Sequence, residues 1–182
     1  MSSIDEALSK AAWKSENFSG YKAFTANASI GQGFISVTPM QLMMMLARIV
    51  TGKAVQPVLL KHQNYNNFNV VPFQTQNLKL IQRCLENIFN SSKGTGFAAR
   101  IQEKQFAMAG KTGTAQVISK NVQDGYSLKS SLTSHSLFVG YAPIDTPKYS
   151  CVVLAENAGW GSVVAGPIGR DILLFVQKNF SV

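Results

Sequence analysis

A run in the second half of the chain, Ala109–Ala115, has side chains suited to holding a carboxylate. A lysine ammonium beside a threonine hydroxyl binds a carboxylate by charge and by hydrogen bonding. A glycine in the run removes a side chain where a ligand backbone can lie against an exposed strand edge. A backbone N–H in such a strand can also face the oxyanion that develops during acyl transfer. The run therefore predicts a site for a peptide with a free carboxylate, formed by Lys111, Thr112, Gly113 and Thr114.

The segment Gly110-Lys111-Thr112 also resembles the end of a phosphate-binding P-loop, which is the first alternative. A P-loop needs a glycine five residues before Gly110, and this chain has Gln105 there. It also needs a helix N-terminus to hold the phosphate, whereas residues 113–117 have the composition of a strand. We therefore predict a strand over Phe106 to Val117 and no nucleotide site.

Two amphipathic helices are predicted before this strand. The first begins at Thr38 and Pro39, where Gln41 completes a capping box, and it ends at Gly52. The second spans Thr75 to Phe89, and the intervening residues 55–60 are expected to form a short strand. The apolar residues predicted to share a face are Leu42, Met45, Leu46 and Ile49 in the first helix and Leu78, Ile81, Leu85 and Ile88 in the second.

After a serine-rich connection, Ser119 to Ser134, two apolar runs predict an antiparallel hairpin. They are Leu137 to Tyr141 and Tyr149 to Ala155, and we expect both to be central, well-buried strands. A glycine-rich loop, in which Trp160 is expected to pack inward, leads to a last helix. On this helix Ile168, Ile172, Phe175 and Val176 share a face. The chain thus predicts an α/β (α+β) fold, an antiparallel sheet flanked by helices.

Composition limits the other functions open to the chain. Its 182 residues suit one domain, which we place at residues 29–182 after a weakly patterned lead-in at 1–28. The net charge is +8, but the basic residues are scattered, so nucleic acid is not an expected partner. No apolar run approaches the roughly 20 residues of a membrane helix, and the N-terminus lacks the pattern of a signal peptide.

No metal or cofactor is predicted from the pattern of potential ligands. Cys84 and Cys151 are expected to be buried free thiols, because each lies in an apolar stretch. His135 precedes a core strand, and we interpret it as a hydrogen-bonded or surface residue and not as a catalytic base.

Four blocks of the sequence, in order, resemble the transpeptidase domain of class B penicillin-binding proteins. Together they cover about Ser29 to Phe180. The Lys-Thr-Gly strand is part of the signature of this superfamily. The blocks are Ser29–Gly33 followed by Thr38–Gln41, then Ala109–Ala115, Phe138–Pro143, and the run that ends in Glu156-Asn157.

The resemblance implies an incomplete penicillin-binding/serine β-lactamase-like transpeptidase fold and a role for each residue of the strand. Lys111 would be catalytic, binding the substrate carboxylate and tuning the protons of a serine nucleophile. Thr112 and Thr114 would hydrogen-bond that carboxylate beside Gly113, and the Thr114 N–H would form half of the oxyanion hole. The implied ligands are a peptidoglycan stem peptide ending in D-Ala-D-Ala and β-lactams, with no cofactor. Through the parent protein, anchored in the bacterial inner membrane with this domain outside the cytoplasm, a SEDS-type glycosyltransferase is a further implied partner.

The serine nucleophile of this family is not evident in the chain. Its motif has a lysine three residues after the serine, and only Ser19–Lys22 has that spacing. Ser15–Asn17 is the only Ser-x-Asn, and the two motifs stand in the reverse of the family order, so we interpret both as chance matches. We therefore expect a C-terminal fragment that is inactive alone. The alternatives are a relative of serine β-lactamases or D,D-carboxypeptidases, and a non-enzymatic basic module that binds wall polymer or nucleic acid.

Overall fold

The computed structural model describes residues 25–26, 28–29, 31, 36–60, 68–115 and 134–180. The chain divides into two compact units, Met1–Thr38 and Pro39–Val182. In the first unit, the Ser29 hydroxyl donates a hydrogen bond to the carbonyl oxygen of Ala26 at 2.6 Å. The boundary that we expected between residues 28 and 29 stays a prediction.

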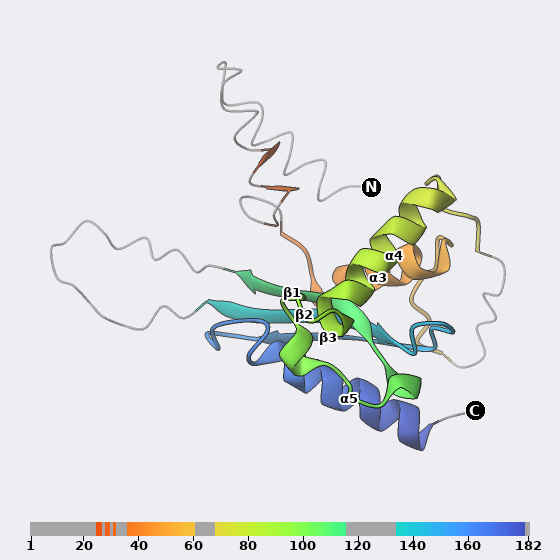
Figure 1. The fold of residues 1–182 in the computed structure, drawn as a ribbon. Helices are drawn as coiled ribbons and strands as arrows, with labels where there is room; N and C mark the ends of the chain where they lie inside the picture. Colours follow the sequence, from red (N-terminus) through yellow and green to blue (C-terminus); the bar gives the residue numbers. More distant parts are fainter. Residues whose placement is uncertain are drawn as a thin grey trace, which may run out of the picture. The chain divides into compact units, whose positions relative to one another are not determined.

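The second unit contains a three-stranded sheet with helices on both faces (Figure 1). The strands are antiparallel and lie in the order β1-β2-β3. Helices α3 and α4 pack on one face and α5 packs on the other (Figure 1). The predicted fold class is therefore confirmed. The elements are α3 (Pro39–Thr51), α4 (Thr75–Asn90), the short 3₁₀ turns η1 (Phe97–Ala99) and η2 (Lys104–Phe106), β1 (Ala109–Ala115), β2 (His135–Ala142), β3 (Tyr149–Ala155) and α5 (Ala165–Asn179).

The sheet separates two apolar clusters. On the side of α3 and α4, Leu46 packs with Ala109 and Tyr141. On the side of α5, Phe138 of β2 packs with Leu173. The C-terminal end of α4 also contributes to this cluster, because the ring of Phe89 meets that of Phe138 edge-to-face, with 5.5 Å between ring centroids. Because directly paired residues of an antiparallel sheet lie on the same face, this division fixes the face on which every residue of β1 lies.

The two helices before the sheet form where the sequence predicts them. Helix α3 ends at Thr51 and is followed by Gly52, which has a φ of 66° and whose N–H donates to the carbonyl oxygen of Arg48 at 2.9 Å. This left-handed conformation favours glycine. Two of the predicted core positions are wrong, because Met45 is 50% exposed and Ile81 is 41% exposed.

The last helix buries a different face from the one that its large apolar residues mark. Ile168, Ile172 and Phe175 are 42%, 42% and 60% exposed. The buried residues are instead Ala165, Gly166, Gly169, Leu173 and Gln177. The physical reason is steric, because a side chain at Gly169 would collide with the ring of Phe138. The small residues let α5 lie close against the sheet, which larger side chains would prevent.

Three strand predictions need correction. The residues at 55–60 form no strand, and the one bridge near them within the described ranges joins Lys53 and Val70. β1 begins at Ala109 and not at Phe106, because η2 occupies the preceding residues. Within the described residues β3 pairs only with β2, so it is an edge strand and not a central one.

Candidate functional site

The predicted carboxylate-binding residues lie along β1, which is the opposite edge strand of the sheet. β1 pairs with β2 on one side, with Lys111 opposite Val139 and Thr112 opposite Phe138. No strand among the described residues pairs with its other side. An unpaired edge presents backbone N–H and C=O groups that can bind an extended peptide.

The register divides the side chains of the motif between the two faces. Lys111 lies on the face of α3 and α4, as its partner Val139 does, and it is exposed. Its ammonium donates a hydrogen bond to the carbonyl oxygen of Thr112 at 2.6 Å. Thr112 and Thr114 lie on the face of α5. Thr112 is only 7% exposed, whereas Thr114 is half-buried, so the ammonium and the Thr114 hydroxyl are the more accessible polar groups of the strand.

A glycine-rich loop between β3 and α5 is bound to this strand. The N–H of Gly161 donates to the hydroxyl oxygen of Thr114 at 3.2 Å. A side chain at Gly161 would collide with the carbonyl groups of Gly113 and Leu137. Glycine is therefore required at this position because the loop backbone lies directly against the sheet.

Ser136 holds the same loop from beneath. This serine is fully buried, and its hydroxyl donates to the carbonyl oxygen of Trp160 at 3.1 Å and accepts from the N–H of Ala165 at 3.0 Å. The N–H of Gly159 donates to the carbonyl oxygen of Ser134 at 2.8 Å. Backbone and side-chain hydrogen bonds thus hold the loop at the C-terminal end of β1.

Trp160 is 71% exposed, so the prediction that it packs under the loop is wrong. The glycines on either side bring the loop backbone onto the sheet, and the indole remains outside. Gly159 has a φ of 84°, a conformation that glycine adopts without strain. The sequence signal for this arrangement is the Gly-Trp-Gly segment itself, which our sequence analysis did not interpret as part of a site.

His135 is a structural residue at the start of β2. Its Nδ1 atom accepts a hydrogen bond from the N–H of Asn157 at 3.0 Å. Asn157 has a positive φ of 52° in the turn that follows β3. The prediction of a hydrogen-bonded histidine is confirmed, and the contact fixes the approach to the glycine-rich loop.

The two cysteines are free thiols, but neither is fully buried as predicted. Cys84 is exposed, since it lies on the outer side of α4, so its predicted burial is wrong. Cys151 is half-buried in β3, and its burial raises the pKa of its thiol to about 11. Such a thiol is protonated at neutral pH and is a poor nucleophile. In the part of the chain that the structure describes, no group of acidic, histidine or cysteine side chains is arranged to hold a metal ion.

Both candidate nucleophile motifs, Ser15–Asn17 and Ser19–Lys22, lie outside the described residues. The same holds for most of the block Ser29–Gly33 and for most of the connection at 119–134. No helix in the described ranges is both long and apolar enough to cross a lipid bilayer.

Comparison with known proteins identifies the protein family to which the chain belongs. The family model "Penicillin binding protein transpeptidase domain" matches residues 4–174. The chain therefore belongs to the penicillin-binding protein transpeptidase family, and the resemblance found in the four sequence blocks is confirmed.

Within that family, several similar proteins carry the name Peptidoglycan D,D-transpeptidase MrdA. The protein named Peptidoglycan D,D-transpeptidase MrdA from Haemophilus influenzae is 32% identical over 168 residues, which are 82% of this chain and 25% of that protein. Its counterpart from Salmonella typhimurium is 29% identical over 187 residues, covering 93% of this chain and 30% of the relative. The chain thus spans between a quarter and a third of the length of these relatives.

Solved structures show the same fold. The penicillin-binding protein PBP2 from Helicobacter pylori matches with a TM-score of 0.70 at 22% identity, over 95% of this chain and 30% of that one. Pseudomonas aeruginosa PBP2, solved in complex with WCK 5153, matches with a TM-score of 0.65 at 22% identity, over 94% of this chain and 36% of that one.

Proposed function

We propose that this chain supplies the substrate-binding part of a peptidoglycan D,D-transpeptidase and that its serine nucleophile comes from a part of the domain outside its sequence. The observation that carries the proposal is the position of Lys111 and Thr114 on an open sheet edge, beside a loop bound to that edge. The proposed substrate is a stem peptide ending in D-Ala-D-Ala, and β-lactams are proposed to occupy the same place.

Each residue has a distinct role in this proposal. The Lys111 ammonium attracts the terminal carboxylate and lowers the cost of removing the proton from the serine. The Thr114 hydroxyl, on the other side of the strand, donates a hydrogen bond to the same carboxylate, while its N–H stabilises the oxyanion. Gly113 leaves space for the peptide backbone. Thr112 is nearly buried, so we assign it the lesser part in carboxylate binding.

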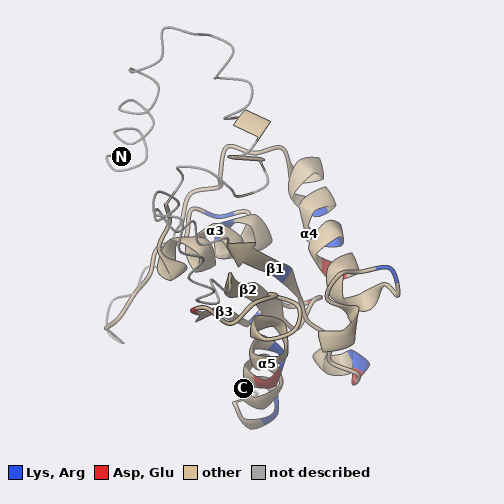
Figure 2. Cartoon of the chain, turned by 90° about the vertical axis from the view of Figure 1, so that its left-hand side faces the viewer, with Lys and Arg blue, Asp and Glu red and all other residues tan. Residues whose placement is uncertain are grey.

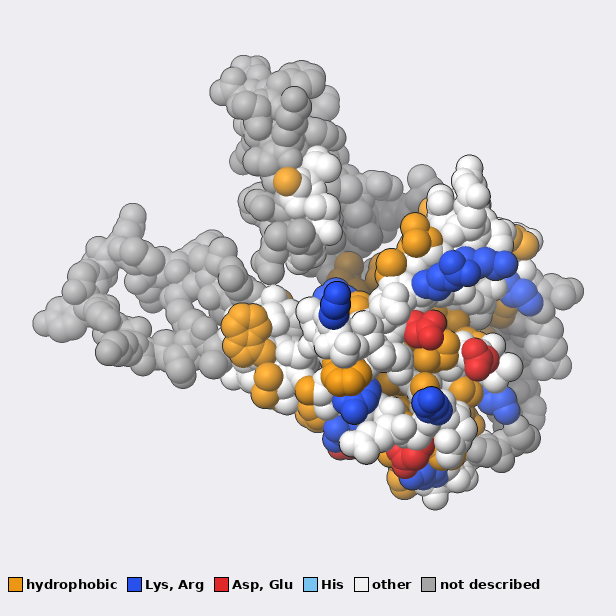
Figure 3. Space-filling model, viewed as in Figure 1, with side chains coloured by type: hydrophobic (Ala, Val, Ile, Leu, Met, Phe, Trp, Pro, Cys, Tyr) orange, Lys and Arg blue, Asp and Glu red, His pale blue; other side chains and the backbone are white. Residues whose placement is uncertain are grey.

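The incomplete apolar surface supports the view that further polypeptide completes the domain. β3 contains no charged residue, and its outer edge is unpaired among the described residues. Next to it, α5 exposes a stripe of Ile168, Ile172 and Phe175. Hydrophobic side chains lie open on the surface in Figure 3 as well. Uncovered apolar surface of this kind favours association with another segment.

The other proposed functions have less support. The basic residues are spread over α3, α4, β1 and α5 (Figure 2), so no single element forms a basic face for nucleic acid. A β-lactamase or carboxypeptidase would share the Lys-Thr-Gly strand but would release an acyl group to water.

For the whole protein we propose anchoring in the inner membrane, with this domain outside the cytoplasm, and a SEDS-type glycosyltransferase as a partner.

Fluorescent penicillin tests the proposal directly. The isolated chain is expected to form no covalent adduct, because Ser19–Lys22, the only Ser-x-x-Lys in its sequence, is interpreted as a chance match. Joining the chain to the serine-bearing part of the H. influenzae relative is expected to produce a stable adduct, and Lys111→Ala should slow its formation at least tenfold. Lys93→Ala, at an exposed lysine outside β1, is the matched control. A stable adduct on the isolated chain would contradict the proposal, as would an unchanged rate of adduct formation in the Lys111→Ala variant of the joined protein. Rapid release of the adduct from the joined protein would favour the β-lactamase alternative.

A further inference from the structure

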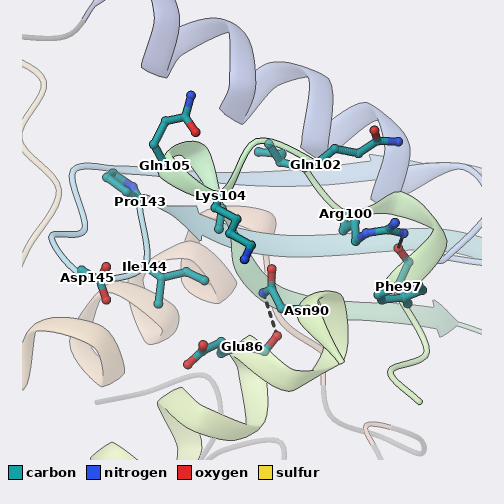
Figure 4. Close-up of a pocket in the computed structure, with 12 residues that line it drawn as sticks. Glu86, Asn90, Phe97, Arg100, Gln102, Lys104, Gln105, Pro143, Ile144 and Asp145 are labelled. Carbon is teal, nitrogen blue, oxygen red and sulfur yellow. Dashed lines mark hydrogen bonds between the residues drawn. The ribbon is translucent and has the colours of Figure 1, made fainter. Parts of the chain in front are cut away.

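A second candidate site is a cavity of about 400 Å³ that shares no residue with the Lys111–Thr114 strand segment. It lies between the second half of α4, the segment from Phe97 to Ala107, and the turn that joins β2 to β3 (Figure 4). This volume falls within the range of small-molecule sites, roughly 300 to 1,000 Å³.

Charged side chains of both signs line the cavity, and they are separated by sign. Glu86 and Asp145 lie at one side, Arg100 lies at the other, and the Lys104 side chain reaches in between them (Figure 4). The ion pairs formed between described residues, Arg170–Asp171 and Lys178–Glu103, lie elsewhere. Glu86, Lys104 and Asp145 therefore have no ion-pair partner in the described part of the chain.

The positive side is held in place by its own contacts. The Arg100 guanidinium lies over the ring of Phe97, 3.9 Å from the centroid, and donates to the Phe97 carbonyl oxygen at 3.0 Å. These contacts orient the guanidinium before any ligand arrives, which lowers the entropic cost of binding. Phe97 also gives this side of the cavity an apolar wall.

On the negative side of the cavity, Glu86 affects the pKa of a buried tyrosine. Tyr141 is 3% exposed, and burial raises the pKa of its phenol, with a further contribution from the negative charge of Glu86. The Glu86 carboxylate is therefore close enough to this buried phenol to raise its pKa electrostatically. A ligand ammonium at this side would supply the missing positive charge.

We infer that this cavity binds a small zwitterion, namely a free amino acid or a dipeptide with both ends unblocked. The two carboxylates and the two cations cancel in formal charge, so the walls favour a ligand that carries both signs over one with a net charge. The ligand ammonium lies toward Glu86 and Asp145, and its carboxylate lies toward Arg100 and Lys104. The side-chain amide of Asn90, which lies between Glu86 and Arg100 (Figure 4), is the nearest uncharged polar group to the middle of such a ligand.

Calorimetric titration of the whole 182-residue chain with three L-dipeptides tests the inference. The probes are L-alanyl-L-alanine, its N-acetyl derivative and its C-terminal amide, and their L-configuration differs from that of the substrate proposed for β1. The unblocked dipeptide should bind saturably, and each blocked form should bind at least tenfold more weakly, a difference of about 1.4 kcal/mol. Absence of saturable binding, or equal binding of all three probes, would overturn the inference.

Substitutions locate the binding. Glu86→Gln and Lys104→Met should each lower the affinity for L-alanyl-L-alanine at least tenfold, whereas Lys79→Met, on an exposed part of α4 away from the cavity, should leave it unchanged. Circular dichroism of each variant shows whether the fold is kept, and the comparison of the three probes needs no variant. Lys111→Ala should not alter the affinity. A loss in Lys111→Ala as large as in Lys104→Met would place the ligand at β1 and refute a separate site, without bearing on the proposed transpeptidase role.

Discussion

The hydroxyl oxygen of Thr114 accepts a hydrogen bond from the N–H of Gly161 at 3.2 Å, which joins the edge strand to the loop before α5. The two residues are far apart in the sequence, yet the contact holds the loop that carries the exposed residue Trp160 at the end of the proposed substrate strand. The hydrogen bond thus holds the loop against the C-terminal part of the edge strand.

Replacing Thr114 with valine tests this contact. The variant keeps the shape of the side chain but leaves the Gly161 N–H without its acceptor, so the free energy of unfolding should fall by about 1 kcal/mol. Thr114→Ser retains the hydroxyl and should lose less. Chemical denaturation measures both, and equal stability of the valine variant and the natural protein would show that the hydrogen bond contributes nothing.

Trp160→Ala should weaken binding of a peptide that ends in D-Ala-D-Ala by about tenfold and leave stability nearly unchanged. The indole is 71% exposed, so its removal creates no cavity, while an exposed aromatic ring contributes contact area to a bound ligand. Fluorescence anisotropy with a labelled peptide measures the affinity. Phe73→Ala, at a 63% exposed aromatic residue on the segment before α4, is the control. A large loss of stability in Trp160→Ala would indicate a packing role instead.

Gly169→Val should destabilise the protein by about 1 to 3 kcal/mol, because the new side chain enters space that the Phe138 ring occupies. Ile168→Val, on the exposed stripe of the same helix, should change stability by less than about 0.5 kcal/mol. Thermal unfolding of the two variants gives the comparison. A neutral Gly169→Val would mean that α5 does not rest against Phe138.

Alkylation should distinguish the two cysteines. Cys84 is exposed and should react first with iodoacetamide, whereas burial raises the pKa of the Cys151 thiol to about 11 and keeps it protonated. Mass spectrometry of peptides from the partly labelled protein measures the order. Faster labelling of Cys151 near neutral pH would contradict the assigned burial.

The same pKa makes stability depend on alkaline pH. The unfolded thiol ionises near its ordinary pKa of 9.0, below the folded value of about 11. Raising the pH through this interval therefore removes protons from the unfolded chain first, so the free energy of unfolding should fall between pH 9 and about 11. The Cys151 contribution to this fall should disappear in Cys151→Ala, and identical pH profiles of the two proteins would disprove it.

The local chemistry of β1 could be predicted from sequence because it depends on neighbours in the chain. Lys111 and Thr114 are close along one strand whatever the remainder of the domain does, and the alternation of a strand places them on opposite faces. The bounds of α3, α4 and β3 follow similarly from caps, turns and apolar periodicity. The resemblance to the penicillin-binding protein family could also be recognised from sequence, because it is carried by short local motifs.

Only the tertiary structure decided which apolar residues are buried and what surrounds the strand. Periodicity marks Ile168 and Phe175 as a stripe on α5, but the helix buries Gly169, because glycine alone allows it to lie against Phe138. The contact between Thr114 and Gly161, and the cavity between Glu86 and Arg100, join residues that are distant in sequence. Such contacts depend on the packing of whole elements, and no local pattern of residue types specifies it.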